Sequence, residues 1–232
     1  MGTRASRASF ENGVIMKWVN KVLALCLMLG FISFFLTLQV RAESNFSVVK
    51  SNAEQGNADA QFNLAVKYYY GEGIPQDFKK AIYWYTKAAE QGDVRAQFSL
   101  GAKYYDGEGA PQDNTKAAYW FTKAAEQGNI RAQNLLGTMY YEGLRVPQDY
   151  VKAVHWFTKA AEQGEVRAQS LLGTMYYSGE GVPQDYVKAY VMLNRAASQG
   201  NATSKYNREI LLKLMSSPQI KEGQKLSKQL YK

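Results

Sequence analysis

The sequence has almost none of the side chains on which most covalent and metal chemistry depends. Of its 232 residues, one is a cysteine, Cys26, and one is a histidine, His155. Cys26 lies in an N-terminal segment that we expect to be removed. The mature chain would then have no disulfide, no thiol nucleophile and no thiolate metal site.

The central part of the chain also has little net charge, although the whole chain carries +8. Residues 1–42 contribute five Lys or Arg against one acid, and residues 205–232 contribute seven against two, which leaves residues 43–204 at −1. A protein that tracks phosphates needs its basic residues on the working surface. We therefore expect no nucleic-acid partner.

Only one long apolar run occurs, from Val22 to Val40, and Lys17 and Lys21 precede it. With small residues at Val40 and Ala42, residues 1–42 are predicted to be a signal peptide that starts naturally at Met16 and is cleaved after Ala42. The alternative is an uncleaved membrane anchor, because the run approaches spanning length. Either way the rest of the chain lies outside the cytoplasm, as a periplasmic or secreted protein or as a membrane-anchored one.

The rest of the chain is repetitive. Glycines recur every 36 residues at Gly56, Gly92, Gly128, Gly164 and Gly200. A period of this size indicates stacked supersecondary units. We divide the chain into a lead-in, four units and a cap, with these bounds: 43–56, then 57–92, 93–128, 129–164 and 165–200, then 201–232.

Each unit reads as two helices. In the first unit, residues 58–70 carry an apolar face, Gly71 is a left-handed cap, and Asp77 is the N-cap of a second helix over residues 78–91. In the C-terminal segment, residues 201–232, Ser217 is predicted to be the N-cap of a helix with Pro218 at its first position.

The motif resembles the Sel-1-like repeat, a relative of the tetratricopeptide repeat. The residues that carry the resemblance are A-x-A-Q-x-x-L, then Y-Y-x-G-x-G-x-P-Q-D-x-x-K-A-x-x-W, then K-A-A-E-Q-G. The resemblance implies an all-α, right-handed solenoid that acts as an adaptor and binds a protein or peptide. We expect no cofactor. Two departures stand out: Arg145 replaces a loop glycine expected at φ > 0, and Met192 replaces the tryptophan of the other units.

Positions that vary while the scaffold stays constant are the candidate binding residues. On the first helices they share one face, which the resemblance places on the concave side of the stack. The candidates are Arg95, Arg131, Arg167, Ser99, Leu135, Leu171, Asp106 and Glu142. An arginine near a helix N-terminus is unfavourable, so the three arginines need either an acid within the chain or an acidic partner.

The leading hypothesis is a non-enzymatic scaffold. The alternative is a cell-envelope enzyme that acts on peptidoglycan or β-lactams, with carboxylate pairs such as Glu108 and Asp113 for acid–base work. Such pairs recur in three units, so none is unique. Relatives of this repeat family described as β-lactamases are rich in cysteine, which this chain lacks. His155 occupies a column of aromatic residues and is predicted to pack rather than to act as a base or ligand.

Overall fold

The computed structural model describes residues 46–229, so the predicted signal peptide lies outside the described part. Residues 46–54 are helical, and the described part contains no strand. The helices that follow are α2 (Ala58–Tyr70), α3 (Phe78–Glu90), α4 (Val94–Asp106), α5 (Asn114–Glu126), α6 (Ile130–Glu142), α7 (Tyr150–Glu162), α8 (Val166–Ser178), α9 (Tyr186–Ser198), α10 (Ala202–Leu214) and α11 (Ser217–Gln229). Among the described residues, none of these helices is long and apolar enough to cross a membrane.

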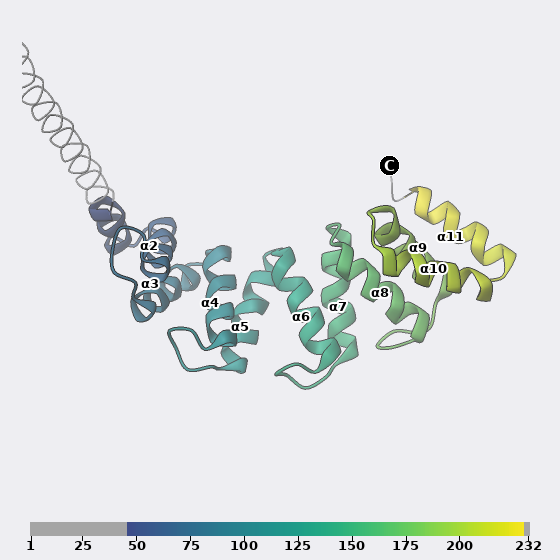
Figure 1. Ribbon diagram of the computed structural model, residues 1–232, viewed down its shortest axis with the longest axis horizontal. Helices are drawn as coiled ribbons and strands as arrows, with labels where there is room; N and C mark the ends of the chain where they lie inside the picture. Colours follow the sequence, from purple (N-terminus) through teal and green to yellow (C-terminus); the bar gives the residue numbers. More distant parts are fainter. Residues whose placement is uncertain (1–45, 230–232) are drawn as a thin grey trace, which may run out of the picture.

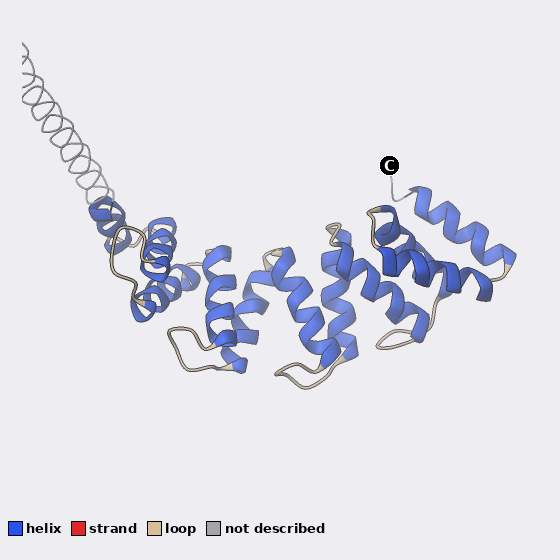
Figure 2. Cartoon of the chain, in the orientation of Figure 1, coloured by secondary structure: helices blue, strands red, loops and turns tan. Residues whose placement is uncertain are grey.

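The helices form an elongated, curved row of antiparallel pairs (Figures 1 and 2). In each unit the first helix packs against its own second helix, which in turn packs against the first helix of the next unit. This arrangement confirms the predicted all-α solenoid. It exposes a long, continuous surface on each side, because each unit contacts only its neighbours.

The helix ends form where the sequence places their caps. Asn57 Oδ1 accepts a hydrogen bond from Ala60 N across 2.8 Å, and Asp77 Oδ1 accepts one from Lys80 N across 3.0 Å. Gly71 has φ 72°, a conformation that costs glycine nothing. The loop between the helices is closed by Gln76, whose Nε2 donates to Tyr69 O across 2.7 Å. These bonds satisfy backbone groups that a helix end leaves unpaired.

Close approach of the two helices in a unit depends on small residues in the first helix. A Cβ at Gly137 would lie 2.5 Å from the ring of Phe157. Phe157 is completely buried, and Gly101 receives Phe121 in the same way one unit earlier. Small residues in the first helix therefore make room for the large side chain of the second.

A row of buried glutamines joins successive units. Gln97 Nε2 donates to Ala89 O in the preceding unit across 3.1 Å, and Gln127 Nε2 donates to Gln97 Oε1 across 2.8 Å. The same pair of bonds recurs with Gln61 and Gln91, Gln133 and Gln163, and Gln169 and Gln199. Both glutamines recur in all four units, but sequence reasoning assigned them no role.

The C-terminal cap departs from the pattern of the units. Helix α10 continues the row of first helices, but α11 packs against α9 instead of pairing with α10 as a second helix would. The ring of Tyr190 on α9 packs directly against Gly223 of α11, where the Cβ of any other residue would lie 2.7 Å from the ring. The side of α10 that a second helix would cover is therefore left open.

The start of α11 also corrects a prediction. Ser216, not Ser217, is the N-cap, because Ser216 O accepts the bond from Ile220 N and Ser216 N donates to Gln219 Oε1. Pro218 accordingly occupies the second helical position. The difference is one residue, and it arises because the side chain of Gln219 reaches back to Ser216, a contact that the Ser-Pro pair alone does not reveal.

Candidate partner-binding face

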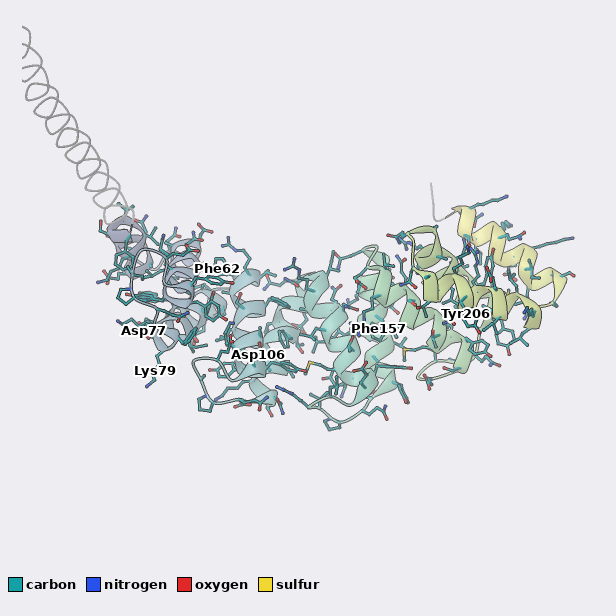
Figure 3. The ribbon with its side chains drawn as sticks, in the orientation of Figure 1. Phe62, Asp77, Lys79, Asp106, Phe157 and Tyr206 are labelled. Carbon is teal, nitrogen blue, oxygen red and sulfur yellow. The ribbon has the colours of Figure 1, made fainter. Side chains whose placement is uncertain are left out.

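The first-helix face is the surface formed by the varying positions of α4, α6 and α8. In each helix these positions are spaced by four, three and four residues, which keeps them on one side of the helix. Among the first helices, α8 contacts both of its neighbours, α6 and α10, directly. Such contact is what the inner side of a curved stack requires. Tyr206 on α10 lies near the C-terminal end of the row, and Asp106 lies nearer the other end (Figure 3).

Arg95 is held by contacts within the chain. Its Nη2 lies 2.6 Å from Asp93 Oδ2 and 2.6 Å from Asp59 Oδ1, and its guanidinium lies 4.3 Å from the ring centre of Phe62. Burial favours the neutral form of Asp93, yet hydrogen bonds from Arg95 and from the backbone of Ala96 hold the pKa of Asp93 below its ordinary value. For Arg95, the intramolecular explanation of its position is therefore sufficient.

Arg131 and Arg167 differ from Arg95. Within the described residues, both are exposed and neither makes a hydrogen bond or an ion pair through its guanidinium. Asn129 takes the place of Asp93 in the third unit and carries no charge, while Glu165 in the fourth accepts a hydrogen bond from Ala168 N. Two guanidinium groups on successive first helices are therefore available to an external anion.

The other predicted residues of this face fall into two groups. Ser99, Leu135 and Leu171 are half-buried, and each leucine packs against a core cluster formed by its own unit and the preceding one. Asp106 and Glu142 end their helices in exposed positions. The structure thus places a leucine beside each unpaired arginine, and it leaves a carboxylate exposed at the far end of α4 and of α6, whereas α8 ends at Ser178.

A hollow on this face was missed by sequence reasoning. Between α8 and α10 a cavity of about 220 Å³ is lined by Thr174, Tyr177, Leu193, Asn207 and Ile210. The signal was present in the sequence, since Leu193 occupies the position of the larger Tyr85, Phe121 and Phe157. Because Leu193 fills less space, the first-helix face is indented next to Thr174.

Exposed apolar side chains extend this hollow along α10. Tyr206, Ile210 and Leu214 are spaced by four residues and are 65%, 36% and 51% exposed. Tyr206 occupies the position of Phe62 and Phe98, whose rings pack against Tyr85 and Phe121 of their own second helices, but α11 has turned onto α9. The result is an uncovered apolar stripe that adjoins the hollow.

The carboxylate pairs proposed for acid–base work are engaged in structural contacts. Glu108 Oε2 lies 2.7 Å from Lys103 Nζ and accepts a hydrogen bond of 2.6 Å from the Tyr69 hydroxyl of the preceding unit. The Lys103 ammonium, and then the Tyr69 hydroxyl, lower the pKa of Glu108. Asp113 caps its helix at Lys116 N. A carboxyl kept ionised in this way is poorly suited to be a general acid.

The lone histidine and the substituted loop glycine lie away from this face. His155 is exposed on α7, with its ring centre 4.8 Å from that of Trp156. Arg145 has φ 62°, as its position predicted, and is the single non-glycine residue at positive φ among those described. Its guanidinium lies 4.1 Å from the ring centre of Tyr105 and donates a hydrogen bond to Tyr105 O.

Comparison with known proteins agrees with this architecture. The Sel1 repeat matches four consecutive segments, residues 58–93, 94–129, 130–165 and 166–201. The chain belongs to the Sel1 repeat family. Sel1-repeat proteins generally serve as protein-interaction scaffolds and are typically non-catalytic.

Two solved structures of Sel1-type proteins resemble the chain closely. A Sel1 repeat protein from Oxalobacter formigenes is 39% identical, with a TM-score of 0.64 over 73% of this chain and 49% of its own. The protein c5321, a protective antigen of uropathogenic Escherichia coli strains that displays an SLR fold, is 41% identical, with a TM-score of 0.64 over 80% and 40%. This chain thus spans half or less of either protein. No curated protein matched the chain.

Proposed function

We propose that this Sel1-repeat chain is a non-enzymatic scaffold that binds an acidic segment of a partner protein along its first-helix face, outside the cytoplasm. The observation that carries the proposal is the pair of unpaired arginines, Arg131 and Arg167, in a row whose first member, Arg95, is fully engaged. Each arginine lies near a helix N-terminus, where the helix dipole disfavours a cation. An anion from outside would relieve this cost.

The neighbouring surface defines the rest of the partner. Arg131 and Arg167 present planar donor groups that suit carboxylates. The hollow beside Thr174 and the stripe on α10 are apolar, and such a patch beside charges is typical of an interaction site. The partner segment would place carboxylates over α6 and α8 and an apolar side chain over α10.

Location outside the cytoplasm rests on the predicted signal peptide. Both related structures come from bacteria, and one is a protective antigen, which is compatible with a protein exposed outside the cytoplasm. The location remains part of the proposal.

Charge reversal tests the binding face. A variant with Arg131→Glu, Arg167→Glu and Leu135→Ala should keep the helical content of the wild type and lose its partner in affinity capture from the exporting compartment. A matched control reverses two exposed lysines of second helices, Lys79→Glu and Lys159→Glu, and should retain the partner. Equal capture by both variants would reject the face. Unfolding of the first variant would assign the arginines to the scaffold.

A second variant tests the apolar part of the same surface. Replacing Ile210 and Leu214 with serine should weaken capture without changing the melting temperature by more than a few degrees, because neither side chain belongs to the buried core. If capture is unchanged, the partner does not extend over α10. The alternative enzymatic function is tested by incubating the purified protein with peptidoglycan and with β-lactams, where we expect no turnover.

A further inference from the structure

The fourth unit contains a second cavity, on the opposite side of α9 from the first-helix face. It has a volume of about 450 Å³ and lies between the second helices α7 and α9, with α11 as an additional wall. Its size falls within the range of about 300–1,000 Å³ that is usual for ligand sites. The first-helix face plays no part in it.

The repeats themselves show what this space accommodates. In the third unit, Trp156 is 8% exposed and packs in a cluster with Ala124, Ala125 and Leu136. The residues one period later are Ala160, Ala161 and Leu172, and Met192 packs against them in the position of the tryptophan. Because a methionine is smaller than an indole, the wall that surrounds Trp156 is retained around Met192 but is not filled.

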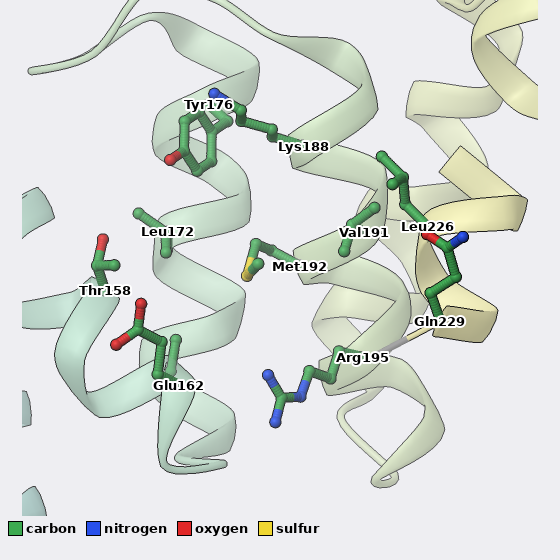
Figure 4. A pocket seen from close by; sticks show the side chains of 11 residues that line it. Thr158, Glu162, Leu172, Tyr176, Lys188, Val191, Met192, Arg195, Leu226 and Gln229 are labelled. Atoms are coloured by element: carbon green, nitrogen blue, oxygen red, sulfur yellow. The ribbon is translucent and has the colours of Figure 1, made fainter. Parts of the chain in front are cut away.

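The walls of the cavity are mostly apolar. Met192 lies at its centre with Leu172 across from it, and Leu226 of α11 closes one side (Figure 4). Tyr176 and Val191 add to the apolar lining, and Thr158, Lys188 and Gln229 contribute polar groups. Helix α11 has no counterpart in the other units, so the cavity combines the remnant of a tryptophan site with a wall that exists only at this end of the solenoid.

Two unpaired charges stand at the mouth of the cavity. Glu162 of α7 and Arg195 of α9 lie on opposite sides of one end, with the Arg195 guanidinium directed toward α7 (Figure 4). Among the described residues, neither side chain has a hydrogen-bonding or ion-pair partner. A carboxylate can accept the N–H of a buried indole, and a guanidinium can lie against the face of the ring.

We infer that this cavity is a docking site for a tryptophan side chain presented by a partner protein. The indole would enter against Ala161, Leu172 and Met192, as Trp156 enters one unit earlier. Its N–H would be donated to the Glu162 carboxylate, and Arg195 would contact its face. The inference does not depend on the proposed first-helix face, since the two sites lie on different sides of α9.

Titration with N-acetyl-tryptophanamide, followed by NMR of the methyl groups, tests this site in the purified protein. The ring current of a bound indole should shift the Met192 methyl signal saturably, while Met139, Met175 and Met215 stay in place. N-acetyl-leucinamide at the same concentration should leave Met192 unmoved. An unshifted Met192 signal, or equal shifts with both probes, would overturn the assignment.

A larger side chain at position 192 should fill the cavity and exclude the probe, and a side chain of similar size to methionine provides the matched control. Met192→Trp should raise the melting temperature and abolish the probe-induced shift of the Ala161 methyl, whereas Met192→Leu should keep that shift. If Met192→Trp does not fold, Met192→Phe provides the same test. Retention of binding with the cavity filled would place the probe elsewhere and overturn the inference.

Two further experiments test the role of Glu162 and Arg195 and the role of the C-terminal residues. Glu162→Gln and Arg195→Gln should each lower the affinity for N-acetyl-tryptophanamide severalfold. Lys221→Gln, on the exposed side of α11, should leave that affinity unchanged. Residues 230–232 follow Gln229, which lines the cavity. If a chain that ends at Gln229 shows a moved Met192 signal without probe and gains probe affinity, the chain's own terminus fills the site and the partner assignment is wrong.

Discussion

Gln91 donates a hydrogen bond from its Nε2 to Gln61 Oε1 across 2.7 Å, and thereby joins the end of one second helix to the first helix of the same unit. Gln61 in turn donates to Ala53 O across 3.0 Å, in the helix that precedes the unit. A buried amide that donates one hydrogen bond and accepts another offsets most of the cost of removing it from water. The repeated pair therefore fixes the orientation of each unit relative to the one before it.

Removal of one glutamine of this row should weaken a single junction. Gln133→Leu deletes the bond to Ala125 O and leaves Gln163 without one acceptor, so we expect a loss of about 1–3 kcal/mol in the free energy of unfolding. Chemical denaturation followed by circular dichroism measures it. Gln55→Leu, which removes an exposed side chain, is the control and should change stability by less than about 0.5 kcal/mol. Equal effects of the two variants would mean that the row contributes nothing.

The loop glycines should differ in their tolerance of a side chain. An alanine Cβ at Gly181 would lie 2.4 Å from Tyr150 O in the preceding unit, whereas at Gly73 no atom lies within 4 Å. Both residues have positive φ, 71° and 74°. Gly73→Ala should cost about 1–2 kcal/mol from backbone strain alone. Gly181→Ala should cost clearly more, because the loop must also move off α7. The melting temperatures of the two variants measure this difference. Equal decreases in melting temperature would show that the loop is not packed against α7 in solution.

The sequence predicts that Arg145→Gly raises stability, and the structure changes this expectation. Glycine would relieve strain of about 1–2 kcal/mol at φ 62° but would lose the contacts of the guanidinium with Tyr105. We now expect Arg145→Gly to be close to neutral and Arg145→Ala, which keeps the strain and loses the contacts, to be destabilising. Thermal unfolding of both variants separates the two effects. If Ala and Gly are equally stable, the strain is negligible.

Stability should fall in acid partly because of the second-helix caps. Backbone hydrogen bonds from Lys80, Lys116 and Lys152 are the largest cause that lowers the pKa of Asp77, Asp113 and Asp149 below 3.8. Because the folded-state pKa lies below the unfolded one, this stabilisation is fully present above pH 3.8 and is lost as the pH falls through the folded values.

Asparagine at all three positions tests this linkage, since it caps a helix as well as aspartate does but does not titrate. The melting temperature of the wild type should fall more steeply below pH 4 than that of the triple variant, and the two should run parallel above pH 5. Parallel curves throughout would show that other carboxylates govern acid unfolding.

The mature chain should begin at Glu43. Val40 and Ala42 present small side chains to a signal peptidase, so cleavage after Ala42 is expected. N-terminal sequencing of the protein from its native host measures this directly. Ala42→Tyr should block processing, whereas Gln39→Ala should not. Recovery of an intact chain from membranes, starting at Met16 or earlier, would identify an anchor instead.

Repeat period, helix limits and caps could be predicted from the sequence, because they depend on contacts within a few residues. Asp77 and Lys80 are three residues apart, and Gly71 needs only its own backbone to end a helix. The first helix occupies residues 58–70 as predicted, and the second ends within one residue of the prediction.

The candidate sites were decided by contacts between units. Arg95, Arg131 and Arg167 are equivalent in sequence, yet among the described residues only Arg95 of the three pairs with acids. Asp59 lies one period before it, whereas another arginine lies one period before each of the other two. Likewise, Met192 and Leu193 are conservative replacements in a sequence comparison. A cavity forms beside each of them because the neighbouring helices keep the spacing that larger side chains need. The packing of α11 on α9 rather than on α10 then adds a wall to the cavity at Met192 and leaves α10 uncovered beside the hollow at Leu193. Such features depend on residues roughly 36 positions apart, so tertiary packing determined them, while local hydrogen bonding determined the units.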